Sequence, residues 1–370
     1  MSTTLVTGFP RLLSKLVARE LLARGADEVV LLVRPRYVDD ARRFIETLGA
    51  NVRLLEGDAT AIDLGLGGAE YLALARRLTR VHHAAQAVWE GAETRAVTAL
   101  NVQGTHEVLE LARTARSLGA EGRVVAYSST LVAGDWEGLV REGDLELGQR
   151  FRTEVERSLY EAERMLRRAS SSVPVTVVRP SIVVGHSETG EIDVFDGPYL
   201  FLLLLLGSPV DITLPLPGGG AAALNVVPAD HVARAGVTLG EVSHESLRTF
   251  HVVDPHALPA RRVFELLAAA AGRRLPRSTI PVNLTRALLR TPGIDRLARS
   301  PRAFVERLAA RTVFDAEGAA AVLTPAGVAC PPFERYANTL VRYTRERLAA
   351  RRVRPDATAS VEPEVDDPLA

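Results

Sequence analysis

The sequence predicts an α/β protein built on a doubly wound, parallel Rossmann-type sheet, with a smaller C-terminal mixed α/β substrate region. Short β-rich runs alternate with helical patterns through the first half of the chain, which is typical of a parallel sheet with helices on both faces. The first β-rich run ends in a glycine turn and leads directly into a helix. With 370 residues, the chain is long enough to bury a sizeable core.

Six strands and the helices between them can be assigned in order. The expected strands are 3–6, 29–33, 52–55, 81–84, 124–128 and 175–178. The expected helices are 11–23, 39–48, 70–77, 96–116 and 153–168. Right-handed crossovers between these runs place all six strands in one sheet. Beyond Gly185 the rhythm changes to a strand at 249–253, a helix at 260–271 and helical stretches as far as residue 350.

These patterns divide the chain into parts. We expect a dinucleotide-binding domain over 1–185, a substrate or cap region over 186–350 and a disordered tail over 351–370, with 221–255 a candidate for return to the first domain. The apolar run 200–206 is far shorter than the roughly 20 residues of a membrane span. It favours a buried helix, and the wall of an apolar substrate channel is the alternative.

Composition excludes several classes of function. The 45 basic and 45 acidic residues balance, so no net charge attracts nucleic acid or an anionic membrane. The N-terminus enters a strand without a leader pattern, and the single Cys330 excludes an internal disulfide, so we expect a cytoplasmic protein. His82 and His83 are adjacent on a strand and point to opposite faces, which argues against a metal site.

The glycine turn reads Thr7-Gly8-Phe9-Pro10-Arg11-Leu12-Leu13-Ser14 and lies where a dinucleotide pyrophosphate meets a helix N-terminus. Of the three glycines in the usual fingerprint, only Gly8 is present, because Arg11 and Ser14 occupy the other two positions. The long side chain of Arg11 either crowds the pyrophosphate or clamps it with a bidentate guanidinium. Both interpretations stay open.

Seven further motifs follow in a fixed order. They are Leu32-Val33-Arg34-Pro35, Gly57-Asp58-Ala59-Thr60, His82-His83-Ala84-Ala85, Asn101-Val102-Gln103-Gly104-Thr105, Ser128-Ser129-Thr130, Arg179-Pro180-Ser181-Ile182-Val183-Val184-Gly185 and Asn225-Val226-Val227-Pro228-Ala229-Asp230. In this order and spacing the chain resembles the extended short-chain dehydrogenase/reductase superfamily. Within it, the chain is similar to the thioester-reductase and fatty acyl-CoA reductase-like group, over about residues 3 to 345.

The resemblance implies an NADP(H) cofactor and an apolar small-molecule or acyl-thioester substrate. A homodimer through the helices 96–116 and 153–168 is also consistent with it. The residues that it places at the cofactor are Thr7, Gly8, Arg11, Leu12, Arg34, Asp58, Ala59, Ala84, Ala85, Pro180 and Val183.

Three of the matched residues have an alternative interpretation. Arg34 would meet a ribose 2′-phosphate, which favours NADP(H) over NAD(H), or it is a surface arginine. Asp58 would accept a hydrogen bond from the adenine amino group, or it caps a helix. Asn101 would brace the active-site backbone, or it is satisfied within its own helix.

The catalytic pattern of the resembling family is incomplete here. Its members use a Ser or Thr to orient the carbonyl, a Tyr to transfer the proton, and a Lys four residues later to lower the pKa of that Tyr. Ser129 matches the first role. Aligning Ser158 and the run 161–163 places Val155 at the tyrosine and Leu159 at the lysine.

The absence of the lysine does not depend on this alignment, because Lys15 is the only lysine in the chain and lies near the glycine turn. Tyr160, with Arg157 or Arg164 as the positive charge, is the alternative catalytic machinery. However, Tyr160 lies one position past the lysine site, about 100° around the helix from it.

Three hypotheses about function follow from the sequence. The first is a relative of NADP-dependent carbonyl or acyl-thioester reductases with impaired chemistry, retained for binding or regulation. The second is an active enzyme with substituted machinery, such as a non-standard reductase, lyase, isomerase or cyclase. The third is a non-catalytic interaction module.

Overall fold

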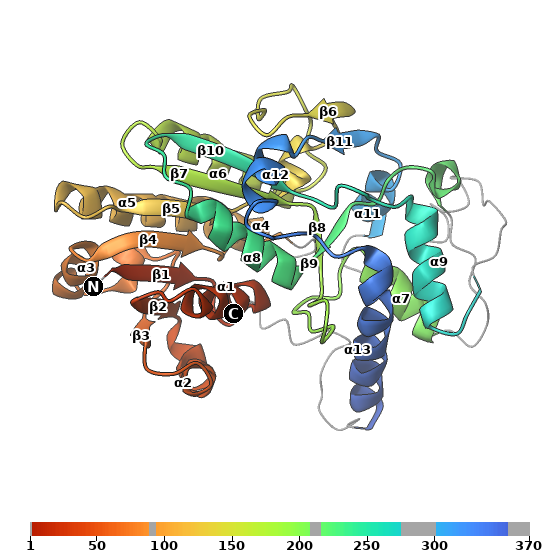
Figure 1. Ribbon diagram of the computed structural model, residues 1–370, viewed down its shortest axis with the longest axis horizontal. Coiled ribbons are helices and arrows are strands. Elements are labelled where there is room, and N and C mark those ends of the chain that lie inside the picture. The colour runs from red at the N-terminus through yellow and green to blue at the C-terminus, as the bar shows by residue number, and fades with distance from the viewer. Residues whose placement is uncertain (1, 89–93, 208–215, 275–300, 354–370) are drawn as a thin grey trace.

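The computed structural model describes residues 2–88, 94–207, 216–274 and 301–353. Its centre is a seven-stranded sheet of order β10-β7-β5-β4-β1-β2-β3, in which every neighbouring pair is parallel (Figure 1). This confirms the doubly wound α/β class. The strands are β1 (Thr3–Thr7), β2 (Glu28–Val33), β3 (Val52–Glu56), β4 (Leu78–His83), β5 (Arg123–Tyr127), β7 (Val175–Pro180) and β10 (Leu247–Val252).

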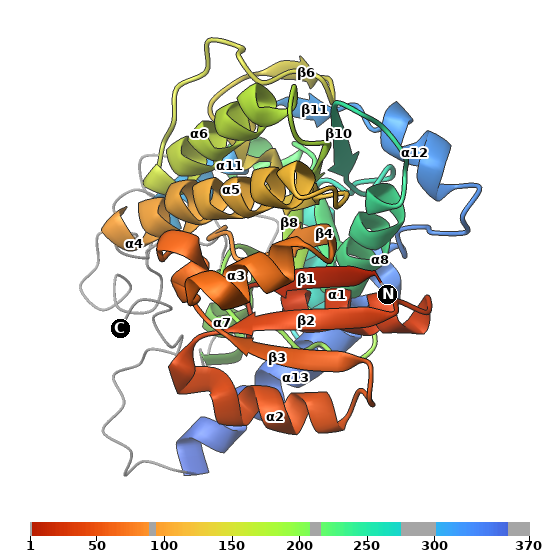
Figure 2. The ribbon, with the colours of Figure 1, turned by 90° about the vertical axis from the view of Figure 1, so that its left-hand side faces the viewer.

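The central strands β1, β2, β5 and β7 are buried along almost their whole length because helices cover both faces of the sheet. Alternate residues face opposite sides, so Val6 and Leu31 join one core while Leu5 and Leu32 join the other. The first face is covered by α1 (Leu12–Ala23), α2 (Val38–Glu46) and α8 (Ala229–Gly240). The second face is covered by α3 (Gly68–Ala75), α5 (Gly104–Ser117) and α6 (Glu154–Ala169), and α5 and α6 lie side by side (Figure 2).

The long helix expected over 96–116 is interrupted. A short helix α4 (Thr94–Thr98) is followed by a π-helical turn at Ala99–Gln103, and α5 begins only at Gly104. Asn101 lies in this widened turn and is fully buried. Turns of this kind are frequent at functional sites, because they re-aim a side chain within a helix.

The sheet has one strand more than the six expected. The segment β9 (Val226–Pro228), α8 and β10 brings the chain back to the sheet edge, where 247–252 pairs in register with 175–180 of β7. The strand predicted at 249–253 therefore lies in the main sheet, and α8 covers the sheet face beside α1.

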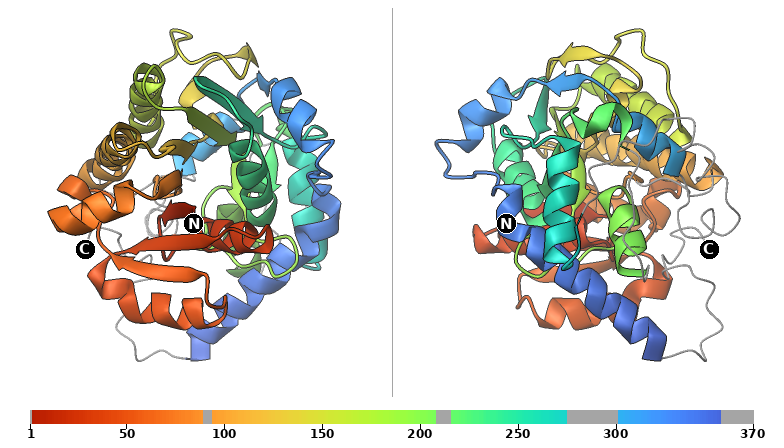
Figure 3. Two further views of the ribbon diagram at one scale, coloured as in Figure 1. Left: turned by 60° about the vertical axis from the view of Figure 1, so that its left-hand side comes forward. Right: turned by 90° about the vertical axis from the view of Figure 1, so that its right-hand side faces the viewer.

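The C-terminal half has its own apolar core. Helices α7 (Pro198–Gly207), α9 (Ala260–Ala270) and α13 (Phe333–Val353) pack together in this core (Figure 3). The apolar run 200–206 lies in α7, where Phe201 stacks edge-on against Phe264 at 4.8 Å between ring centroids. Smaller elements complete the region: β6 (Gly138–Val140), β8 (Ile182–Val184), α11 (Pro301–Arg307), β11 (Thr312–Phe314) and α12 (Glu317–Leu323).

Most of the disordered tail predicted over 351–370 lies outside the described residues, which end at residue 353. Among the helices that are described, none is long and apolar enough to cross a membrane.

A buried ion pair ties α6 to the sheet. Arg179, at the end of β7, is 0% exposed, and its Nη2 lies 2.6 Å from Oε2 of Glu163 on α6. Glu163 also accepts a hydrogen bond of 2.6 Å from the hydroxyl of Ser128 at the end of β5. Nη1 of Arg179 donates to the carbonyl of Asp144 at 2.8 Å. Both charges are therefore paired and hydrogen-bonded, as burial requires.

We predict that Glu163→Gln lowers the free energy of unfolding by about 3–5 kcal/mol, because it leaves the Arg179 charge buried without a counter-charge. Urea unfolding at neutral pH measures this loss. Glu161→Gln removes the same charge from the exposed side of α6 and should change stability by less than about 0.5 kcal/mol. Equal stability of the two variants would show that the pair does not hold the helix.

Candidate functional site

Two cavities lie at the carboxyl ends of the strands on either side of the β1–β4 switch point, where doubly wound sheets bind their ligands. The first cavity, of about 280 Å³, is lined by the β1–α1 turn, the ends of β2 and β3, and α13. The second cavity, of about 160 Å³, is lined by the ends of β4, β5 and β7 together with β8. Arg11, Ile192, Asp193 and Val194 belong to the walls of both.

Most of the expected cofactor residues line one of these cavities. Gly8, Arg11, Arg34, Asp58, Ala59 and Ala85 line the first, and Arg11, Leu12, Ala84, Pro180, Val183 and the candidate catalytic Ser129 line the second. Thr7, Asn101 and Tyr160 line neither. The hydroxyl of Thr7 is fully buried and lies 2.9 Å from Nδ1 of His83. The apolar run 200–206 also lines neither cavity, so the model gives no support to the channel-wall alternative.

Gly8 fits the turn for a steric reason. Its φ is +99°, and a Cβ at this position would lie 2.6 Å from the carbonyl oxygen of Ala84. Arg11 precedes the first residue of α1 and supplies no side-chain cap. Instead, a carboxylate oxygen of Asp193 accepts a hydrogen bond of 2.7 Å from the backbone N–H of Leu12. No sequence motif pointed to Asp193, because it lies in an irregular segment 181 residues from Leu12.

Arg34 and Asp58 bind each other in the first cavity. Nε of Arg34 lies 3.0 Å from Oδ2 of Asp58, and Nη2 lies 3.1 Å from Oδ1. Asp58 also accepts hydrogen bonds from the backbone N–H and the hydroxyl of Thr60, both at 2.8 Å. Asp58 therefore stabilises its own turn and orients the guanidinium. Lys15 and Arg347 add positive charge to the same cavity.

Asn101 braces the backbone beyond β4. Its amide Nδ2 donates to the carbonyl of Ala87 at 3.0 Å, and its Oδ1 accepts from the N–H of Ala87 at 2.6 Å. Nδ2 also lies 2.9 Å from the hydroxyl of Ser158 on α6. The π-helical turn and the first part of α6 are thus joined through one buried side chain.

The positions expected to carry the tyrosine and lysine are part of an apolar cluster. Val155 is 3% exposed and Leu159 is 0% exposed. They pack in one cluster with Ala87, Val97, Leu100, Val132 and Leu145. These buried members are all apolar and can neither transfer a proton nor hold a positive charge, while the partly buried Tyr160 packs against them.

The residues of the alternative machinery on α6 make contacts outside the two cavity walls. The ring of Tyr160 packs on Phe151 at 4.9 Å between centroids, and the guanidinium of Arg164 lies 5.7 Å from the Tyr160 ring. The side chain of Arg157 is 60% exposed. None of these residues lines either cavity.

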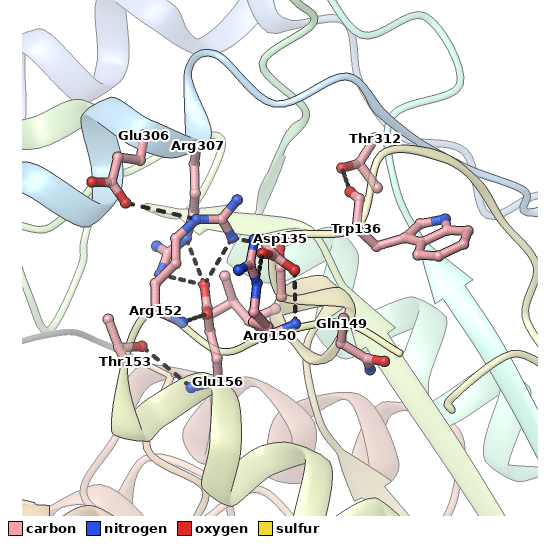
Figure 4. Close-up of polar contacts among 12 residues, drawn as sticks. Asp135, Trp136, Gln149, Arg150, Arg152, Thr153, Glu156, Glu306, Arg307 and Thr312 are labelled. Atoms are coloured by element: carbon pink, nitrogen blue, oxygen red, sulfur yellow. Dashed lines mark hydrogen bonds and ion pairs between the residues drawn. The ribbon is translucent and has the colours of Figure 1, made fainter. Parts of the chain in front are cut away.

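The C-terminal half places a guanidinium at the start of α6. Arg307 of α11 lines the second cavity, and its Nη2 lies 3.2 Å from Oε1 of Glu156, which is 1% exposed (Figure 4). Arg152 also pairs with Glu156 at 3.5 Å. Burial lowers the pKa of Arg307 to about 10, so it stays charged at neutral pH. Sequence reasoning missed Arg307, because it is 151 residues from its partner.

Several polar groups face the mainly apolar second cavity. The hydroxyl of Ser129 accepts from the N–H of Leu131 at 3.2 Å. Gln86 Oε1 and Ser181 Oγ are buried and have no hydrogen-bond partner among the described residues. Burial raises the pKa of Asp196, which lines the same cavity, to about 6. Gln86, Ser181 and Asp196 were not among the candidate site residues expected from the sequence.

The two adjacent histidines are held in separate environments. Nδ1 of His82 lies 3.0 Å from the hydroxyl of Tyr127, whereas Nδ1 of His83 lies 2.9 Å from that of Thr7. Burial lowers the pKa of His82 to about 3 and that of His83 to about 4, so both are neutral at pH 7. Neither histidine lines a cavity.

The chain is similar to parts of larger curated proteins. Glycine betaine reductase ATRR of Emericella nidulans is 26% identical over 283 residues, which are 71% of this chain and 22% of the relative. A carboxylic acid reductase of Mycobacterium tuberculosis is 26% identical over 294 residues, which are 69% of this chain and 24% of the relative. The chain therefore spans about a quarter or less of the length of these relatives.

Solved structures share the fold at low identity. The terminal R domain of the myxalamid PKS-NRPS biosynthetic pathway has a TM-score of 0.78 at 24% identity, covering 94% of this chain and 91% of that one. MoeE5, solved in complex with UDP-glucuronic acid and NAD, has a TM-score of 0.63 at 20% identity, covering 94% of this chain and 100% of that one.

The model of an NAD-binding family described as Male sterility protein matches residues 6–236 of this chain. This stretch carries the glycine turn, the first six strands of the sheet, α6 and almost all of both cavity walls up to α8. The resemblance seen in the sequence is thus confirmed, and the chain belongs to the Male sterility protein family, in the thioester-reductase-like group of extended short-chain dehydrogenases/reductases.

Proposed function

We propose that this protein is a reductase-family member that has lost efficient hydride chemistry and uses the crevice formed by its two cavities to bind ligands. The observation that carries the proposal is the apolar cluster around Val155 and Leu159, at the positions of the expected proton donor and its lysine. The relatives include carboxylic acid reductases and reductase domains. This chain would therefore bind the type of ligand that these reductases bind, without the proton transfer that completes the reduction.

The chemical reason is the fate of the carbonyl oxygen. Hydride addition to a carbonyl leaves an oxyanion that needs a proton, and a positioned general acid contributes about 10²–10⁴-fold to such a step. Valine and leucine have no proton to give. Ser129 can still orient a carbonyl in the second cavity, but its hydroxyl is too weak an acid to replace a tyrosine activated by a lysine.

The ligands follow from the two cavities. The first cavity, with the paired Arg34, suits the adenosine end of a nucleotide and favours one with a 2′-phosphate, which is the adenosine half of NADP(H). The second cavity suits an apolar acyl or carbonyl compound, since its walls are mainly Leu12, Leu13, Val88, Leu131, Ile182, Val184 and Phe304. A homodimer would use α5 and α6, which lie side by side (Figure 2).

We expect NADPH oxidation with acyl thioesters or aldehydes no faster than about 0.01 s⁻¹, about 10²-fold below the slow end of ordinary turnover. Absorbance of NADPH at saturating substrate measures it, and Ser129→Ala should not change the residual rate. Turnover above about 1 s⁻¹ that Ser129→Ala abolishes would refute the loss of reductase chemistry.

Arg34 should recognise a 2′-phosphate. We expect Arg34→Ala to weaken binding of adenosine 2′-phosphate by about 10- to 100-fold, because one charge-assisted contact is lost. Calorimetric titration measures the affinity, with Arg36→Ala as the control, since Arg36 stacks on Tyr37 and lines neither cavity. Equal affinities for both variants and the unmodified protein would remove Arg34 from the site.

A second candidate function is an active enzyme with substituted machinery, and Asp196 favours it. Its carboxyl lines the second cavity with Ser129, and burial raises its pKa to about 6, within reach of acid catalysis near neutral pH. If its protonated form is the acid, turnover falls as pH rises through 6. Product formation from pH 5 to 8 measures this, and Asp196→Asn should abolish it. A flat profile would count against this candidate.

A further inference from the structure

The wall between the two cavities lies where a dinucleotide would place its pyrophosphate. Arg11, Ile192, Asp193 and Val194 line both cavities, so they separate the adenosine-side space from the space beside Ser129. A dinucleotide that used both cavities would have to pass this wall with its two phosphate groups.

The carboxylate of Asp193 already occupies the anion position at this wall. Its Oδ2 lies 2.7 Å from the backbone nitrogen of Leu12, the first residue of α1. The first turn of α1 contains no acidic residue, and Arg11 gives no side-chain cap. The negative charge at this helix N-terminus therefore comes from the segment 186–197, where a phosphate would otherwise accept the same N–H.

Arg11 lies in the same wall as this carboxylate and is influenced by its charge. Burial lowers the pKa of Arg11 to about 10, and the charge of Asp193 is the largest influence that raises it. The sequence left two interpretations open for Arg11, crowding and clamping. The structure adds the nearby charge of Asp193, which partly offsets the positive charge that a pyrophosphate would meet.

The crevice consequently fits a dinucleotide at its ends and not at its middle. The first cavity carries Arg34, Lys15 and Arg347 toward a nucleotide, whereas the pyrophosphate position holds the Asp193 carboxyl. Burial raises the pKa of this carboxyl, and Arg11 and the hydrogen bond from the Leu12 N–H act in the opposite direction and favour its charged form. Two phosphate charges next to a carboxylate repel it at close range, and the effect is strong where protein limits the access of water.

We propose that Asp193 is a specificity-determining residue that takes the place of the pyrophosphate. On this proposal the first cavity accepts nucleotides that end before the 5′-phosphate, such as adenosine 2′-phosphate, and intact dinucleotides bind weakly. The proposal rests on the proposed function, because it assumes that the first cavity is a nucleotide site.

The test is calorimetric titration of the full chain with NADP⁺ and with adenosine 2′-phosphate. Asp193→Asn keeps the size of the side chain and an oxygen for the Leu12 N–H, but removes the charge. We expect it to raise NADP⁺ affinity by at least about tenfold and to leave adenosine 2′-phosphate within about twofold. Glu188→Gln removes the same charge from the same segment but lines neither cavity, and should change neither affinity by more than about twofold.

The outcomes separate this inference from the function on which it rests. If adenosine 2′-phosphate binds while NADP⁺ affinity is the same with and without Asp193→Asn, the inference is overturned and the nucleotide site stands. If neither ligand binds any folded variant, as judged by thermal unfolding, both fail. Restored NADP⁺ binding without NADPH oxidation supports both, whereas restored binding with rapid oxidation supports the role of Asp193 and refutes the loss of chemistry.

Discussion

The contact between Arg179 and Glu163 fixes the geometry on which the site depends. It joins the end of β7 to α6, takes in Ser128 at the end of β5, and places Nη1 of Arg179 on the carbonyl of Asp144. A fully buried guanidinium allows few arrangements, because each donor needs a partner in place of water. The orientation of α6, and with it the face that carries Val155 and Leu159, is set by this requirement. The scaffold around these two apolar positions is thus held by polar contacts that do not depend on them.

The parts of the fold that sequence could predict are those with a local cause. Six strands were recognisable because parallel strands buried on both faces are continuous apolar runs. The strand at 249–253 was recognisable too, but its place beside β7 depends on pairing with a segment far earlier in the chain, which no local pattern encodes. The π-helical turn at 99–103 was missed for the opposite reason, since its residues fit an ordinary helix and only the contacts of Asn101 distinguish it.

The same distinction applies to the site. The alignment that places Val155 and Leu159 at the tyrosine and lysine positions rests on Ser158 and the run 161–163, which could be matched from the sequence alone. In the structure Ser158 contacts Asn101, and Glu163 pairs with Arg179. The candidate cofactor residues at the ends of the predicted strands could also be identified from the sequence, since the carboxyl ends of parallel strands meet at one edge of the sheet. Asp193 and Arg307 were not, because both contact partners more than 150 residues away, which no local pattern encodes. Their charges change the chemistry of the crevice while leaving its sequence motifs unaltered.

The packing around Leu159 also determines what a catalytic pair would cost at these two positions. A lysine at Leu159 would place an ammonium group in an enclosed apolar cluster, where it must give up its proton or disrupt the packing. A tyrosine in place of Val155 would add volume to the same filled space. Each substitution by itself thus costs stability, whereas proton transfer from a tyrosine that a lysine activates needs both at once. The dense packing of this cluster therefore favours the apolar pair over any single substitution toward a catalytic one.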